Sequence, residues 1–284
     1  MEIFFKRRKK MSIPKIIHYC WFGRGEKNEL FYKCLESWKL YCPDYEIIEW
    51  NEDNYNIKNQ YVKDAYKEKK WAFVTDYVRL DVVYNNGGIY LDTDVELVKP
   101  LDSLINLHAY FGVESQDLNV NTGLGFGAEK HSSIVKDLRD IYENISFYKG
   151  NGELNLTPCT YYSTNYFEKI GYKKNNETQM VQNVKIFSSE ILSPYNYKNA
   201  SMTNSENTIS IHWYDASWND EDNKKIHKVE VKIRNNFPNI IGDVFCFIYR
   251  KSYRVIKAIQ RGELVNLFIK KLGNIKEKNA KCVK

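Results

Sequence analysis

Strand patterns and helix patterns alternate through residues 13–91, and this alternation restricts the fold more than any other feature of the chain. Short apolar runs bounded by turn residues are typical of buried strands, and apolar residues three and four positions apart are typical of helices. Because such alternation builds a sheet with helices on its faces, we predict an α/β sandwich with a mainly parallel sheet. The strands are expected at 13–20, 45–50 and 89–91, and the helices at 30–41, 62–66 and 71–84.

The rest of the chain continues this pattern less regularly. We expect further strands at 110–113, 124–128 and 208–213, and an amphipathic helix at 131–148. Asn85-Asn86-Gly87-Gly88 contains residues that tolerate left-handed backbone, so we expect the helix before it to stop there.

The composition indicates a folded chain with a large core. Of its 284 residues, 43% are hydrophobic and 15% are aromatic, which excludes an intrinsically disordered protein. The six cysteines form no C-x-x-C pair, so neither a disulfide framework nor a zinc site is indicated. No run approaches the roughly 18 apolar residues of a spanning helix. The basic residues at 6–10 are not followed by the apolar stretch of a secretory signal, and we therefore expect a cytoplasmic protein.

Charge is distributed unevenly along the chain. Eleven Lys and Arg face three Asp and Glu in residues 243–284, and five face one in residues 1–10. Because the whole chain carries only +6, the centre is acidic. We predict a basic arm at 1–10, a catalytic domain at 11–219 and a basic, amphipathic helical appendage at 220–284.

Two aspartates, Asp92 and Asp94, close the predicted strand at 89–91. Side chains alternate along a strand, so these two carboxylates project to the same side and can share one cation. A hard divalent ion held by oxygen ligands can bridge a diphosphate leaving group and stabilise the charge that develops on it. In isolation, a D-x-D pair is more often a solvated pair of surface aspartates than a metal site.

A longer motif surrounds this pair. Residues 73–94 read FVTDYVRLDVVYNNGGIYLDTD, and this run resembles the signature of glycosyltransferase family 32 and, more distantly, that of the glucosylating domains of large clostridial toxins. IIHYCWFG at 16–23 resembles the family's first strand, and HWYDASW at 212–218 resembles its closing segment. The resemblance covers roughly residues 11–219.

The resemblance implies a GT-A fold, with a Rossmann-like mixed sheet flanked by helices. It also implies a nucleotide-sugar donor, Mn²⁺ or Mg²⁺ as cofactor, and transfer with retention of anomeric configuration. We expect a UDP-sugar, with UDP-galactose as the first candidate and UDP-glucose, N-acetylhexosamine donors and GDP-mannose left open. The expected acceptor is a lipid-linked glycan or an oligosaccharide in capsular polysaccharide or lipopolysaccharide synthesis. No carboxylate is identified as a nucleophile, and a front-face route would need none.

The resemblance also implies roles for individual residues. Asp94 would ligate the metal, and Asp92 would contact ribose, sugar or a metal-bound water. The others would serve the donor: Trp21 by stacking on the nucleobase, Asp76 and Arg79 by holding sugar hydroxyls, Tyr90 by lining the nucleoside pocket, and Asn121 by lying near the transferred sugar. Taken alone, Asp76 and Arg79 fit a surface ion pair better, and Trp21 fits the core better.

The closing segment adds two candidates. His212 is a plausible third metal ligand, although a single histidine on a strand is more often structural, and Asp215 or Ser217 could replace it. The indole N–H of Trp218 could donate to a phosphate oxygen.

Two other functions compete with a transferase. A haloacid-dehalogenase-like phosphatase would use Asp92 as its nucleophile, but it requires a later acidic pair, and Gly242-Asp243 lacks the second acid. A nucleic-acid binder would explain the basic ends, but not the acidic centre, so we expect no nucleic-acid partner.

The last expectation concerns residues from about 235 onward. Apolar residues recur there at helical spacing, with Lys and Arg on much of the remaining surface. We predict that this segment binds an anionic membrane, so that the enzyme is peripheral on the inner face of the bacterial cell membrane. The alternative is that these helices pack on the core. The apolar positions are Val244, Phe245, Phe247, Ile248, Val255, Ile256, Ile259, Leu264, Val265, Phe268 and Leu272.

Overall fold

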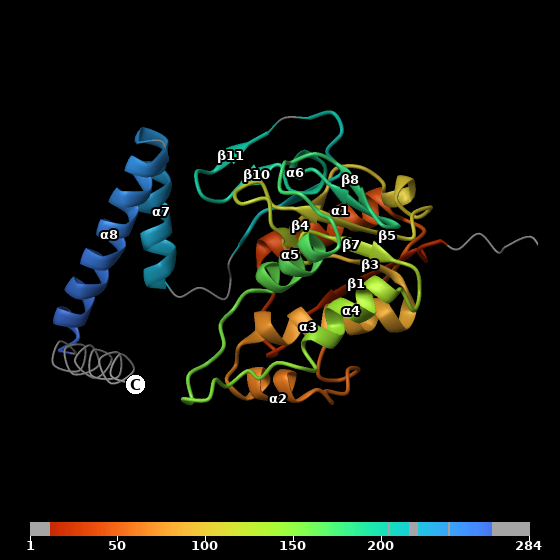
Figure 1. The fold of residues 1–284 in the computed structure, drawn as a ribbon, viewed down its shortest axis with the longest axis horizontal. Helices are drawn as coiled ribbons and strands as arrows, with labels where there is room; N and C mark the ends of the chain where they lie inside the picture. The colour runs from red at the N-terminus through yellow and green to blue at the C-terminus, as the bar shows by residue number, and fades with distance from the viewer. Residues whose placement is uncertain (1–11, 204, 216–220, 238, 263–284) are drawn as a thin grey trace, which may run out of the picture. The chain divides into compact units, whose positions relative to one another are not determined.

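The computed structural model of the chain describes residues 12–203, 205–215, 221–237 and 239–262 (Figure 1). The predicted arm at 1–10 and the apolar positions from 264 on lie outside these residues. The described residues form two compact units. The first contains those up to 197 and those of 201–218, and the second contains those of 198–200 and those from 219 on.

An eight-stranded sheet forms the centre of the first unit (Figure 1). Its strand order is β2-β1-β3-β7-β5-β9-β8, and β6 pairs with β5 beside this path. The strands are β1 (Ile16–Cys20), β2 (Glu46–Trp50), β3 (Gly88–Tyr90), β5 (Ala109–Val113), β6 (Val120–Asn121), β7 (Phe126–Ala128), β8 (Gln179–Val181) and β9 (Val184–Phe187).

The sheet is mixed, so the Rossmann-like mixed sheet implied by the family resemblance is confirmed, and the mainly parallel sheet predicted from alternation is wrong. β1 runs parallel to β2 and β3, and β5 runs parallel to β9. β7, however, is antiparallel to both β3 and β5. The chain leaves β5, turns back through β6, and enters β7 without an intervening helix. Without a helical crossover, the returning strand runs antiparallel to the strand it left.

Helices cover both faces of the sheet and create two cores. One core contains residues of α2 (Gln60–Lys67), α3 (Trp71–Asn86), α4 (Ser133–Ile141) and α5 (Cys159–Lys169). The other contains residues of α1 (Glu29–Tyr41), α6 (Ser189–Leu192) and the 3₁₀ helix η1 (Leu101–Ser103). Within β3, Ile89 belongs to the second core and Tyr90 to the first, as the two-residue period of a strand requires. The α/β sandwich is therefore confirmed.

The paired glycines after α3 make the connection to β3 possible. Gly87 and Gly88 have φ of 70° and 105°, a left-handed backbone that side chains disfavour. A Cβ on Gly88 would lie 2.8 Å from the Ile16 carbonyl oxygen. α3 therefore ends where predicted, and β3 can pair directly with β1.

Some elements differ from the predictions. The helix expected at 131–148 ends at Ile141, because the following N–H groups bond three residues back and Asn144 caps the Asp140 carbonyl with its side chain. The predictions also omit α5, α6, β8, β9 and the hairpin of β10 (Tyr195–Asn196) and β11 (Ser201–Met202).

A small second sheet completes the first unit. β4 (Val95–Leu97) follows the D-x-D pair and is antiparallel to β12 (Ser210–His212). In this register, His212 lies opposite Val95. The closing segment is thereby placed beside Asp94.

The second unit is a pair of helices, α7 (Glu221–Asn236) and α8 (Asn239–Gln260). The buried Cys246 of α8 faces the Glu230 carbonyl, and Arg250 forms a two-pronged ion pair with the Glu230 carboxylate. The Tyr253 hydroxyl donates to Asp222. These contacts run along the length of the pair.

Candidate functional site

Among the described residues, one group of side chains could hold a metal ion. It consists of Asp92, Asp94 and His212, whose ligand atoms lie within 4.8 Å of one another. The cluster forms because the chain carries Asp92 and Asp94 from β3 toward β4, while β12 brings His212 alongside. Two carboxylates and an imidazole suit Mn²⁺ or Mg²⁺ better than they suit soft metals. The donor set therefore fits the metal that the resemblance implies.

Asp94 is the most strongly held member of the cluster. Its Oδ1 lies 3.0 Å from Nε2 of His212, and its Oδ2 accepts a 2.9 Å hydrogen bond from the backbone N–H of Asp215. Burial opposes ionisation of Asp94, but the charge and hydrogen bond of His212 bring its pKa below the ordinary value. Asp94 is thus an anion in the site.

His212 is buried and has one polar partner in the described protein. Burial lowers the pKa of His212, but Asp94 and Asp92 together raise it above its ordinary value. Its Nδ1 has no hydrogen-bond partner among the described residues. A buried nitrogen without a partner costs stability, which favours a functional role for His212 over a purely structural one.

Asp92 is held by one side chain of β3 and one of α3. Its Oδ1 accepts a 2.8 Å hydrogen bond from the Tyr90 hydroxyl and lies 3.2 Å from Nη2 of Arg79. Tyr90 itself is buried, and its ring packs on Phe126. The predicted nucleoside-pocket residue therefore contributes its hydroxyl to the site and its ring to the core.

Asp76 and Arg79 form a buried pair, so the alternative of a surface ion pair is wrong. Their residues are 6% and 4% exposed, and Arg79 Nη2 lies 3.4 Å from Asp76 Oδ1. Burial raises the pKa of Asp76 to about 6. The Arg79 guanidinium also lies 5.0 Å from the centre of the Tyr90 ring, and its Nε–H donates a hydrogen bond to the Thr75 carbonyl. This fixed arrangement links α3 to Asp92.

Gly123 marks the point at which the predicted residues converge. A Cβ there would lie 2.2 Å from Asp92 Oδ2, 3.1 Å from Asn121 Oδ1 and 3.2 Å from Arg79 Nη1. Asn121 Oδ1 accepts a 2.7 Å hydrogen bond from the Gly123 N–H. The structure thus brings Asp76, Arg79, Asp92 and Asn121 to one place.

Trp21 makes its contacts with residues of another group. It follows β1, is partly buried, packs on Phe31 and donates its indole N–H to the Gly25 carbonyl. Its nucleobase role stays a prediction. Trp218 and Ser217 lie outside the described residues, whereas Asp215 approaches Asp94 only through its backbone.

Part of this region is similar to known proteins. Residues 28–110 match the family model described as "Glycosyltransferase sugar-binding region containing DXD motif". This stretch is therefore similar to the sugar-binding region of glycosyltransferases. The match includes Asp76, Arg79, Asp92 and Asp94, and it confirms the predicted resemblance to the DXD-containing transferases.

Two sequence relatives are also named as glycosyltransferases. The chain is 30% identical over 142 residues to inositol phosphoceramide mannosyltransferase 3 of Schizosaccharomyces pombe (strain 972 / ATCC 24843). The aligned residues are 46% of this chain and 37% of that protein. The chain therefore spans just over a third of that relative's length. It is 26% identical over 223 residues to uncharacterized glycosyltransferase L373 of Acanthamoeba polyphaga mimivirus, covering 72% of this chain and 84% of that protein.

A solved structure is also similar. The PaToxG glycosyltransferase superposes with a TM-score of 0.45 at 20% identity, over 56% of this chain and 71% of that chain. Among the described residues, the group of possible metal ligands around Asp92 and Asp94 adds His212 and not the later acidic pair that the phosphatase alternative requires.

Glu114 is a member of the site that the sequence analysis missed. It follows β5, is buried, and accepts hydrogen bonds from Asn119 at 3.0 Å and from Asn121 at 3.4 Å. Burial raises the pKa of Glu114 above its ordinary value. The sequence offers one sign of this role: Glu114 is a carboxylate that directly follows an apolar strand, a few residues before Asn121.

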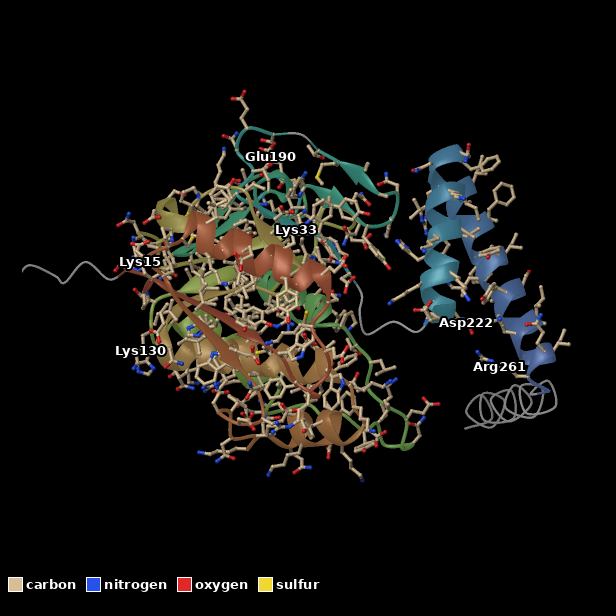
Figure 2. The ribbon with its side chains drawn as sticks, turned by 180° about the vertical axis from the view of Figure 1, so that it is seen from behind. Lys15, Lys33, Lys130, Glu190, Asp222 and Arg261 are labelled. Atoms are coloured by element: carbon tan, nitrogen blue, oxygen red, sulfur yellow. The ribbon has the colours of Figure 1, made fainter. Side chains whose placement is uncertain are left out.

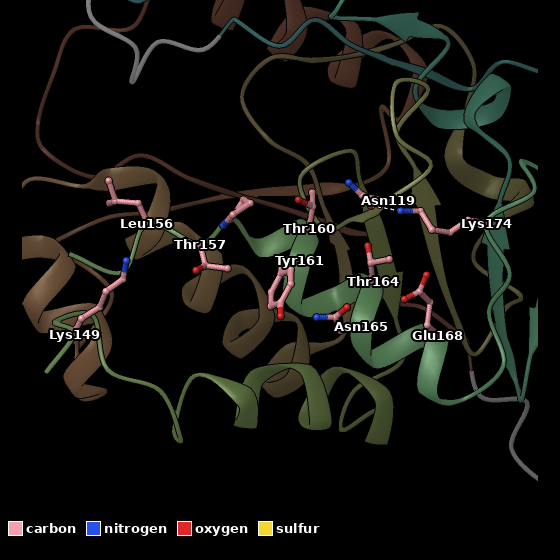
Figure 3. Close-up of a pocket in the computed structure, with 11 residues that line it drawn as sticks. Asn119, Lys149, Leu156, Thr157, Thr160, Tyr161, Thr164, Asn165, Glu168 and Lys174 are labelled. Carbon is pink, nitrogen blue, oxygen red and sulfur yellow. Dashed lines mark hydrogen bonds between the residues drawn. The ribbon is translucent and has the colours of Figure 1, made fainter. Parts of the chain in front are cut away.

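A groove of about 540 Å³ lies along one face of α5 (Figure 3). The opposite face of α5 reaches the sugar-binding region, where the Cys159 thiol hydrogen-bonds Asp76. Asn119 lines the groove and also bonds Glu114, so it connects the groove to the site. Lining residues combine an exposed tyrosine ring with amides, hydroxyls and charges: Asn119, Lys149, Leu156, Thr157, Pro158, Thr160, Tyr161, Thr164, Asn165, Glu168 and Lys174.

Proposed function

We propose that this protein is a retaining, metal-dependent hexosyltransferase that moves a hexose from a UDP-sugar to a glycan acceptor. The observation that carries the proposal is the convergence of Asp92, Asp94 and His212 with the buried Asp76–Arg79 pair, inside and beside a DXD sugar-binding region. One half of this site suits a divalent cation and the other suits sugar hydroxyls. A nucleotide sugar presents both a diphosphate and a sugar to its enzyme.

Each residue has a defined task in this proposal. Asp94, His212 and Asp92 would hold Mn²⁺ or Mg²⁺, which neutralises the charge of a diphosphate leaving group when bound. Arg79 and Asp76 would hold sugar hydroxyls, because a fixed guanidinium and a carboxyl can donate to and accept from them. Asn121, anchored by Gly123 and Glu114, would orient the transferred sugar. Preorganised groups of this kind need little rearrangement during reaction.

The donor and the stereochemical outcome are finer parts of the proposal. UDP-galactose is our first candidate, and GDP-mannose belongs in any panel because the S. pombe relative is named a mannosyltransferase. Retention would follow a front-face route, in which the departing phosphate assists the incoming hydroxyl. ¹H NMR of the anomeric proton in the first-formed product tests retention directly.

The groove along α5 is our candidate for the acceptor. It connects to the site through Asn119, and its tyrosine ring, amides and hydroxyls suit the alternating apolar and polar surface of a sugar chain. A lipid-linked or free oligosaccharide in capsular polysaccharide or lipopolysaccharide synthesis would present such a chain. The name of the S. pombe relative also denotes transfer to a lipid-borne acceptor.

A binding assay separates this proposal from its alternatives. Thermal shift and calorimetry with UDP and GDP, each with and without Mn²⁺, should show nucleotide binding that depends on the metal. Asp94→Asn should abolish that dependence, whereas Asp137→Asn, at an exposed position on α4, should preserve it. Metal-independent binding in the native protein, or undiminished binding by Asp94→Asn, would remove the metal site from the proposal.

A further inference from the structure

The helix α8 exposes a continuous set of large apolar side chains. Nine of them are between 43% and 79% exposed, and Figure 2 shows side chains along α8 that point away from α7. We name this set the α8 apolar face: Ile240, Ile241, Val244, Phe245, Phe247, Ile248, Val255, Ile256 and Ile259. An isolated exposed leucine or isoleucine is ordinary, but an apolar surface that extends over a whole helix marks an interaction site.

The α8 apolar face is not the seam of the helix pair. The side of α8 that packs on α7 contains Cys246, which is buried, together with Arg250 and Tyr253. At 100° per residue, these three positions lie on the side of the helix opposite Ile241 and Ile248. The packing of α7 on α8 therefore leaves the apolar face uncovered.

Charge around the face favours an anionic partner. Residues 221–262 contain ten Lys and Arg against four Asp and Glu. Two of the four cations of α8 are paired, Arg250 with Glu230 and Lys257 with Asp222, and Arg261 just after α8 also pairs with Asp222. Lys251 and Arg254 have no carboxylate partner among the described residues.

Those two cations lie on one side of the apolar face. Helical geometry places Arg254 at one edge of the stripe and Lys251 inside the same half of it. The Lys251 ammonium lies 4.2 Å from the centre of the Phe247 ring. An apolar stripe bordered by cations is the pattern of a helix that lies in the plane of a membrane interface. None of the described helices is long and apolar enough to cross a membrane.

We propose that the α8 apolar face binds the surface of an anionic lipid bilayer, with its apolar side chains at the level of the headgroups and with Lys251 and Arg254 on lipid phosphates. A second copy of the chain fits less well. A symmetric interface through this face would bring the unpaired cations of both copies together. Lipid headgroups instead supply the missing negative charge.

Vesicle sedimentation of the full chain tests the proposal independently of transfer activity. The probes are vesicles of phosphatidylcholine alone and of phosphatidylcholine with phosphatidylglycerol. We expect Ile241→Ser/Ile248→Ser to weaken partitioning onto both by at least ~10-fold. The control pair Tyr32→Ser/Leu40→Ser removes exposed apolar side chains from α1 and should leave partitioning unchanged.

Charge reversal is the second arm of the test. Lys251→Glu/Arg254→Glu should weaken binding to the phosphatidylglycerol vesicles by at least ~10-fold and leave the weak binding to phosphatidylcholine unchanged. Lys63→Glu/Lys67→Glu alters net charge equally at exposed positions on α2 and should have no comparable effect.

Three results would overturn the proposal. The first is equal vesicle binding by Ile241→Ser/Ile248→Ser and the native chain. The second is a dimer, seen by light scattering, that this variant converts to a monomer, because the partner would then be a second copy. The third is a melting temperature that falls far more in this variant than in its control, because the face would then be covered within the protein. None of these three measurements depends on donor binding, so the membrane proposal can still be tested if the donor-binding assay fails.

Discussion

Nε2 of His212 lies 3.0 Å from Oδ1 of Asp94, although one residue belongs to the last strand of the first unit and the other follows β3. The antiparallel pairing of β12 with β4 is what brings them together. Any metal bound by Asp94 and Asp92 would therefore be affected by the position of β12. This relationship leads to the first prediction.

His212→Ala should lower the affinity for Mn²⁺ in the presence of UDP by ~10–100-fold, because one of three ligand groups is lost. Calorimetric titration of Mn²⁺ measures the effect. His18→Ala is the matched control: His18 is buried too, but its Nε2 bonds the Gly87 carbonyl at 2.8 Å, so its loss should reduce stability and spare Mn²⁺ affinity. Equal Mn²⁺ affinities for His212→Ala and the native protein would make His212 purely structural.

Asp76 should make stability depend on pH. Its pKa is raised by burial from 3.8 to about 6, so the folded state holds the proton more tightly than the unfolded state. The free energy of unfolding should therefore fall as pH rises from about 4 to about 6. Asp76→Asn should remove this slope in urea titrations at several pH values, and it should also reduce donor turnover if the residue holds a sugar hydroxyl. An unchanged slope would contradict the burial of an ionisable carboxyl at this position.

Arg79→Lys tests the geometry of the guanidinium at nearly constant charge. A single ammonium cannot reproduce the contacts with Asp76, Asp92 and Thr75, so we expect turnover of the donor to fall by at least ~100-fold. Arg139→Lys is a suitable comparison, because Arg139 pairs with Asp81 and Asp140 away from this site. Similar kcat/KM values in the two variants would show that Arg79 does not touch the donor.

Gly123→Ala should impair the site without unfolding the protein. The added methyl group would meet Asp92 Oδ2 at 2.2 Å, so the carboxylate must move. We expect weaker metal-dependent UDP binding at an unchanged circular dichroism spectrum. Gly150→Ala, where nothing lies within 4 Å of the new Cβ, provides the control. If Gly123→Ala binds UDP normally, the position of Asp92 is not critical.

Tyr161→Ala should separate transfer from donor hydrolysis. If the groove along α5 holds the acceptor, transfer to an oligosaccharide should fall by ~10-fold or more, while hydrolysis of the donor by water persists. Tyr32→Ala, similarly exposed but on α1 across the sheet, should change neither rate. Parallel loss of both activities in Tyr161→Ala would place this residue at the donor instead, and normal transfer would exclude the groove.

Local patterns predicted the elements whose signal lies in consecutive residues. The strand before Asp92, the helix that carries Asp76 and Arg79, and the glycine stop between them were all identified, because periodicity and left-handed glycines act over a few residues. Strand direction was not predicted correctly. β7 pairs with β3 and β5 through contacts distant in the chain, and no local pattern reports which way a strand runs.

The sequence by itself determined the candidate residues of the site: the carboxylates at 92 and 94, the Asp76–Arg79 spacing and the match to a DXD-containing family model all lie in one short segment. Only the tertiary structure decided that the ion pair is buried, that Glu114 and Gly123 belong to the site, and that His212 faces Asp94. The physical reason is that burial and electrostatic coupling depend on which groups surround a side chain. Those neighbours come from β5, β6 and β12, which only folding brings together.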